Sequence, residues 1–66
     1  MTNKMIKEMI REINSNIELY YDFASEGESR QRARSKIFWK ITGMIEMLEM
    51  LTGENYEWDK NGVYVK

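Results

Sequence analysis

The stretch SEGESRQRARSK, residues 25–36, decides the fold, because it interrupts an apolar pattern of helical period that continues on both of its sides. Ser25 and Glu28 match a capping box, in which each side chain caps the backbone N–H of the other residue, and Ser29 is the rival cap. A connection this short joins helices that run antiparallel. The sequence therefore predicts a two-helix hairpin with its loop at residues 25–28.

The first helix is predicted over residues 3–24. Its apolar residues recur at alternating steps of four and three, which places them in one seam along the helix. The seam consists of Ile6, Ile10, Ile13, Ile17, Tyr20 and Ala24. Asn14 and most of the charged residues are expected on the opposite, polar side.

The second helix is predicted over residues 28–52, with Gly53 as its C-terminal cap. Its main apolar face consists of Ala33, Ile37, Phe38, Ile41, Met44, Ile45, Leu48 and Leu51. A second apolar strip consists of Trp39, Gly43, Met47 and Met50. A helix that is apolar on two sides needs two partners. We therefore expect the strip to be the interface of a homo-oligomer, in its simplest form a homodimer that makes a four-helix bundle.

Residues 55–66 are predicted to form a β-hairpin, because Asn61-Gly62 is a strong short hairpin signal. The sequence leaves open a two-residue loop and a four-residue loop. The residues of the inner face are the same in both registers: Tyr56, Trp58, Val63 and Val65. An isolated hairpin is marginal in water, so this face should pack on the helices. The predicted fold class is mainly α, a helical hairpin followed by a small β-hairpin.

The composition limits the chemistry of the chain. Its 66 residues are enough for a single domain, residues 1–66, with a small core. The absence of cysteine and histidine excludes disulfides, thiolate nucleophiles, imidazole acid–base catalysis and the common zinc sites. No catalytic motif is present, so we expect no enzyme activity, no cofactor and no metal. The acidic pairs with helical spacing, Glu8 with Glu12 and Glu46 with Glu49, are typical of a solvated helix face.

The sequence also bears on location. It contains no run of about 18 apolar residues, so no membrane span is expected. Lys4 and Lys7 near the N-terminus are not followed by the unbroken apolar run of a signal peptide. The lack of cysteine is compatible with a reducing compartment, and we expect a cytoplasmic protein.

The net charge of −1 conceals an uneven distribution. Residues 1–28 carry three cations and six acids, whereas residues 29–45 carry five cations and no acid. A helix N-terminus disfavours positive charge by about 0.3–1 kcal/mol per cation. This basic island, residues 29–45, therefore breaks a local rule, and such positions are often functional sites.

On the helical projection, Arg30 and Arg34 align with the main apolar face, whereas Arg32 and Lys36 lie beside Trp39. Arginine side chains bind phosphate and aromatic side chains stack on bases, so the sequence indicates a site for a nucleotide-like anion. The candidate ligand-binding residues are Arg30, Arg32, Arg34, Lys36, Trp39 and Tyr21. In the alternative interpretation, the arginines remain in water or pair with nearby acids: Asp22, Glu26 and Glu28.

The second helix opens with a short motif that small and apolar residues follow: Ser29-Arg30-Gln31, then Ala33, Ser35 and Ile37. In these residues the chain resembles, over roughly residues 5–51, the helical-hairpin proteins of bacteriophages that sequester cyclic-nucleotide signals of bacterial immunity, the anti-CBASS and anti-Thoeris sponges. The resemblance implies an oligomer without catalysis that acts in a bacterial host. It also implies that Arg30 faces a phosphate near a subunit interface.

Two functions from different classes follow from these features. The first is sequestration of a nucleotide-like signalling ligand by a phage accessory protein, which counteracts bacterial immune signalling. The second is inhibition or adaptation of a host defence protein, on which the chain docks through the basic island and the apolar strip. DNA binding is a lesser alternative, because one basic island without a recognition motif gives only salt-sensitive, non-specific affinity.

Overall fold

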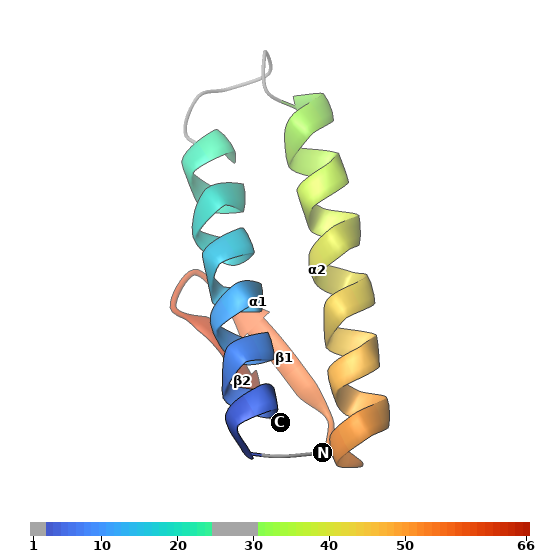
Figure 1. Ribbon diagram of the computed structural model, residues 1–66. Helices are drawn as coiled ribbons and strands as arrows, with labels where there is room; N and C mark the ends of the chain where they lie inside the picture. The colour runs from blue at the N-terminus through green and yellow to red at the C-terminus, as the bar shows by residue number, and fades with distance from the viewer. Residues whose placement is uncertain (1–2, 25–30) are drawn as a thin grey trace.

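The computed structural model describes residues 3–24 and 31–66 of the chain (Figure 1). Helix α1 spans Asn3–Ala24, and helix α2 spans Gln31–Thr52 and runs antiparallel to it. Strands β1, Tyr56–Asp59, and β2, Gly62–Val65, form an antiparallel sheet. This architecture confirms the predicted helix pair followed by a β-hairpin. In the described ranges, neither helix is long and apolar enough to cross a membrane.

The core lies where the two helices face each other. Its buried members are aliphatic and come from both helices: Ile13, Ile17, Ile41, Ile45 and Leu48. Burial of each such side chain contributes about 1.5–3 kcal/mol relative to exposure. Asn16 is also buried, and its Nδ2 donates a hydrogen bond to the backbone oxygen of Glu12 at 2.8 Å. The buried amide therefore keeps a polar partner inside the helix pair.

Helix α2 ends as its sequence predicts. Gly53 adopts a positive φ of 75°, and its N–H donates to the oxygen of Glu49 at 2.8 Å. A left-handed glycine after the last helical residue is the usual way to satisfy these carbonyls. The chain thus turns back and leads β1 toward the helix pair. The predicted start of the second helix at residue 28, and its capping residues, lie outside the described residues.

The hairpin uses a two-residue loop. Trp58 pairs with Val63 and Asp59 with Gly62, which leaves Lys60 and Asn61 as the loop. The Asn61 N–H donates to Oδ1 of Asp59 at 2.8 Å and stabilises the turn.

One face of the hairpin packs against the core, through Tyr56, Trp58 and Val63. Val65 pairs with Tyr56 on the same face, but it lies at the end of the strand and is half exposed.

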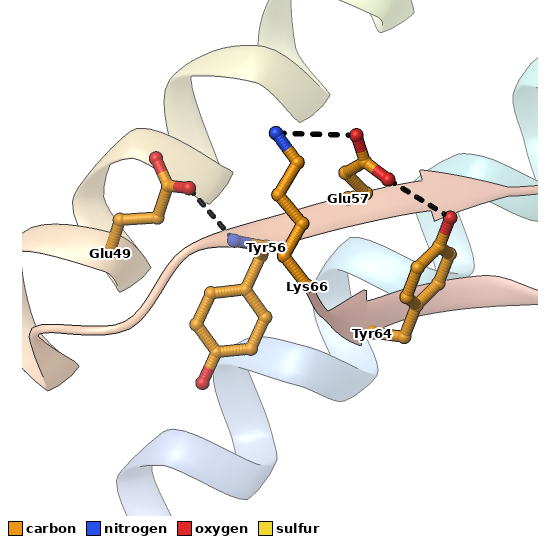
Figure 2. Close-up of polar contacts among 5 residues, drawn as sticks. All are labelled: Glu49, Tyr56, Glu57, Tyr64 and Lys66. Carbon is orange, nitrogen blue, oxygen red and sulfur yellow. Dashed lines mark hydrogen bonds and ion pairs between the residues drawn. The ribbon is translucent and has the colours of Figure 1, made fainter.

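Two helix side chains bind the backbone of the hairpin. Oδ1 of Asn14 in α1 accepts a hydrogen bond from the Val63 N–H at 2.9 Å, and Oε2 of Glu49 in α2 accepts one from the Tyr56 N–H at 2.8 Å (Figure 2). Helix α1 therefore holds β2, and α2 holds β1. The expectation that Asn14 lies on the polar, solvated side of its helix is wrong, because the hairpin covers that position.

Gly62 is required where β2 approaches α1. It is buried with a φ of 122°, and a Cβ at this position would lie 2.8 Å from Oδ1 of Asn14. We expect Gly62→Ala to lower the free energy of unfolding by about 1–3 kcal/mol, because it adds backbone strain and displaces the Asn14 amide. Denaturant unfolding followed by circular dichroism measures the change.

The matched control is Gly43→Ala. Gly43 is exposed within α2, and a Cβ there would have no other atom within 4 Å. This substitution should raise the stability by about 1 kcal/mol, through helix propensity alone. If Gly62→Ala left the stability unchanged or raised it, as Gly43→Ala should, the close approach of β2 to α1 would be refuted.

Candidate functional site

The structure separates the predicted basic site residues. Arg32 and Lys36 are exposed on α2, whereas Arg34 is half-buried. None of these three forms an ion pair with any residue in 3–24 or 31–66. Arg30 lies outside the described residues, as do the acids Glu26 and Glu28. Among the described cations of the island, Arg34 is therefore the one that packing holds in place.

A cleft of about 300 Å³ lies beside Arg34, between the start of α2 and the end of α1. It is lined by Tyr20, Gln31, Arg34, Ser35, Phe38 and Trp39. The fold thus brings two of the predicted site residues, Arg34 and Trp39, into one cleft. Arg34 and Phe38 lie one turn apart on α2, so the guanidinium and an aromatic ring come from the same side of the helix.

Aromatic rings form one wall of this cleft and continue into the hairpin. The Tyr20 ring meets the Trp58 ring edge-to-face, with centroids 5.4 Å apart, and it lies 6.2 Å from the Phe38 ring. Phe38 in turn lies 5.9 Å from Trp58 and 5.4 Å from Trp39. Such pairs contribute about 0.5–1.5 kcal/mol beyond burial. The wall is therefore a packed cluster drawn from α1, α2 and β1.

Tyr21 has a different position from the one expected. Its ring packs edge-to-face on Tyr20 at 5.2 Å and against Trp58 at 6.2 Å, and it does not line the cleft. Tyr20 and Phe38 line the cleft instead. Sequence reasoning missed both as site residues because their spacing assigns them to the apolar seams, which they also complete.

The cleft has the chemistry for a planar anion. A guanidinium presents several N–H donors in a fixed plane that matches phosphate or carboxylate oxygens. Ser35 and Gln31 add a hydroxyl and an amide. The exposed indole of Trp39, 68% accessible, offers a face on which a base can stack. The first turn of α2 contains no acid that would compete for Arg34.

The second apolar strip is exposed in this chain. Met47 and Met50 are 58% and 86% accessible, and Gly43 lies between Trp39 and Met47 with open space around it. Trp39 belongs both to the strip and to the rim of the cleft. Met47, at one edge of the strip, also borders α1, so the part of the strip that faces away from α1 is Trp39, Gly43 and Met50.

A second cleft, of about 510 Å³, lies between α2 and β1 and is acidic. Of its carboxylates, Glu49 binds the backbone of Tyr56, and Glu57 binds both the Lys66 ammonium at 3.3 Å and the Tyr64 hydroxyl at 3.3 Å (Figure 2). No group of three or more potential metal ligands is found in the described part of the chain. Two of the three carboxylates of this cleft, Glu49 and Glu57, therefore contact hairpin residues.

Comparison of the chain with models of known protein families, with curated proteins and with solved structures finds no match in any of the three.

The contact between Tyr64 and Glu57 predicts a pH effect. Desolvation raises the pKa of Tyr64 above its ordinary value, and the Glu57 carboxylate raises it further. The Tyr64 hydroxyl loses its proton near pH 10 in the unfolded chain and at a higher pH in the folded chain. Its contribution to the free energy of unfolding is therefore complete below pH 10 and is lost as the pH rises above that value. We expect stability to fall more steeply above pH 10 in the wild type than in Tyr64→Phe.

Spectrophotometric titration near 295 nm tests the cause. Glu57→Gln removes the neighbouring charge, so the late-titrating tyrosine of the wild type should titrate earlier in this variant. An unchanged titration curve would show that Glu57 does not act on Tyr64.

Proposed function

We propose that the protein is a non-enzymatic binding protein that sequesters a small anionic ligand of nucleotide type in the cleft beside Arg34. One observation carries the proposal. Arg34 is half-buried and without an ion-pair partner in the described residues, and it lines the same cleft as the exposed indole of Trp39. A phosphate would pair with the guanidinium, and a base would stack on the aromatic side of the cleft.

The energetics favour an anion at this position. A cation close to a helix N-terminus loses about 0.3–1 kcal/mol, and a bound anion would reverse that loss by interacting with both the cation and the helix dipole. The sequestration itself needs no bond to be broken, because binding alone removes the ligand from solution. The resemblance to phage sponge proteins supports this mode of action, an oligomeric state, and a place in the cytoplasm of a bacterial host.

A second candidate function is inhibition of a host protein. Its support is the exposure of the strip: Trp39 and Met50 are 68% and 86% accessible on a helix that also carries the basic residues Arg32 and Lys36. Tryptophan and arginine are enriched among the residues that dominate protein–protein binding energy. An acidic protein surface would complement the charge.

Thermal melting with a ligand panel tests the first proposal. The panel contains cyclic di- and trinucleotides, linear nucleotides and inorganic phosphate. A ligand at 100 times its Kd adds roughly 2.7 kcal/mol of stability, which raises the Tm of a small domain by roughly 10–20 °C. We expect a selective rise for one nucleotide class and a much smaller one for phosphate, which cannot use the aromatic wall.

Variants locate the site. Arg34→Gln and Trp39→Leu should each abolish most of the shift, whereas Arg11→Gln, the same change at an exposed position of α1, should leave it intact. A flat panel would refute sequestration and favour the inhibitor. A shift that survives both cleft substitutions would place the ligand elsewhere.

A further inference from the structure

A groove runs between the two helices on the side away from the hairpin. Its volume is about 460 Å³, and five of its seven lining residues are apolar: Met5, Met9, Met44, Met47 and Leu51, together with Glu8 and Glu12. We call it the methionine groove. At about 100° per residue, Met5 lies about 180° from Asn14, and Leu51 lies about 200° from Glu49. The two residues that hold the hairpin therefore face the opposite side.

The methionine groove leaves large apolar side chains in water. Met5, Met47 and Leu51 are 50%, 58% and 48% accessible. Leu19, 42% accessible, continues the same side of α1 by helical spacing. A contiguous apolar surface with a charged rim is typical of an interaction site, and methionines adapt their shape to a partner.

We propose that a second copy of this chain covers the methionine groove, so that two helix pairs pack face to face with their long axes reversed. The positions of the charged residues along the two helices support this arrangement. Nδ2 of Asn16 lies 4.0 Å from Sδ of Met44, so these residues mark one level of the helix pair. Glu12 lies one turn, about 6 Å, from that level toward the start of α1, and Lys40 lies one turn from it toward the start of α2.

Glu8 and Lys36 repeat this arrangement one turn further from the same level. A two-fold axis at the Asn16–Met44 level, lying in the interface and across the helices, exchanges the two ends. The end with the two glutamates then lies over the lysine end of the second copy. A parallel arrangement would place glutamates over glutamates, which is repulsive.

The charges are available for such contacts. Glu8, Glu12, Lys36 and Lys40 are exposed, and none of them forms an ion pair within residues 3–24 and 31–66. Burial of the face at the level of the axis leaves no polar group without a partner there, because the Asn16 amide already donates to its own helix. A C2 interface requires a surface that is complementary to itself, and the glutamates and lysines of this face meet the requirement in charge.

The solvent-accessible surface of the chain also supports a dimer. A compact monomer of 8.0 kDa exposes about 4450 Å², whereas this chain exposes 5017 Å². A standard interface removes about 800 Å² from each partner, so one such contact would more than remove the excess. The cleft beside Arg34 is lined by Phe38 and Ser35, which lie on the hairpin side of α2. A dimer formed through the groove therefore leaves the cleft open, and formation of the dimer does not depend on a ligand in the cleft.

Sedimentation equilibrium and light scattering on the purified chain test the proposal. The expected mass is about 16 kDa, twice that of the 8.0 kDa chain. Leu51→Lys, in the groove, should raise the dissociation constant of the dimer at least tenfold. Met50→Lys, the same change at the adjacent position, which lies about 100° around α2 from Leu51 and does not line the groove, should leave the mass unchanged. Loss of the dimer in Met50→Lys alone would overturn the proposal in favour of the Trp39–Met50 strip.

Charge exchange tests the orientation without touching the apolar residues. Glu12→Lys and Lys40→Glu should each weaken the dimer by about tenfold, because two attractive contacts become repulsive by symmetry. The double variant should recover to within about threefold of the wild type. A double variant as weak as the single ones, or a wild type that stays at 8.0 kDa up to high concentration, overturns the proposal. The second result would leave the groove to a different protein.

Discussion

The structure depends on the contact between the hairpin backbone and two polar helix side chains. Asn14 accepts from the Val63 N–H, and Glu49 accepts from the Tyr56 N–H. Without these bonds, the inward strand amides would lie against a helix surface without an acceptor, which is costly for a buried donor. The bonds commit the hairpin to one side of the helix pair. They thereby decide which helix residues are covered and which remain in contact with water.

The candidate ligand cleft is a consequence of this placement. The hairpin brings Trp58 against Tyr20 and Phe38, which fixes two rings that line the cleft beside Arg34. A cation on a packed wall loses less side-chain freedom on binding than one on an open surface. In the proposed function, a ligand bound at Arg34 would offset the cost of a basic helix start.

The same placement leaves the opposite side of the helices without cover. A core of five buried aliphatic side chains is small for an independent domain, and chains of this size often gain stability by assembling. The methionine groove and the cleft lie on different sides of α2, so the proposed ligand binding and the proposed assembly would be physically separable. The acids that line the groove and the lysines of α2 lie toward opposite ends of the helix pair, which relates the proposed assembly to the uneven charge of the sequence.

The sequence by itself determined the local structure. The isoleucine spacing, Gly53 after the second helix and Asn61-Gly62 predicted two helices and a hairpin, because these signals act between residues close in the chain. Tertiary structure alone decided the contacts between distant residues. Asn14 bonds to Val63, which lies 49 positions away in the sequence. The ring of Tyr20, in α1, packs against Phe38 of α2 and Trp58 of β1. Helical spacing assigns Tyr20 to the core, where it does pack, but it also assigns Asn14 to water. The spacing within one helix carries no information about the side on which the hairpin packs.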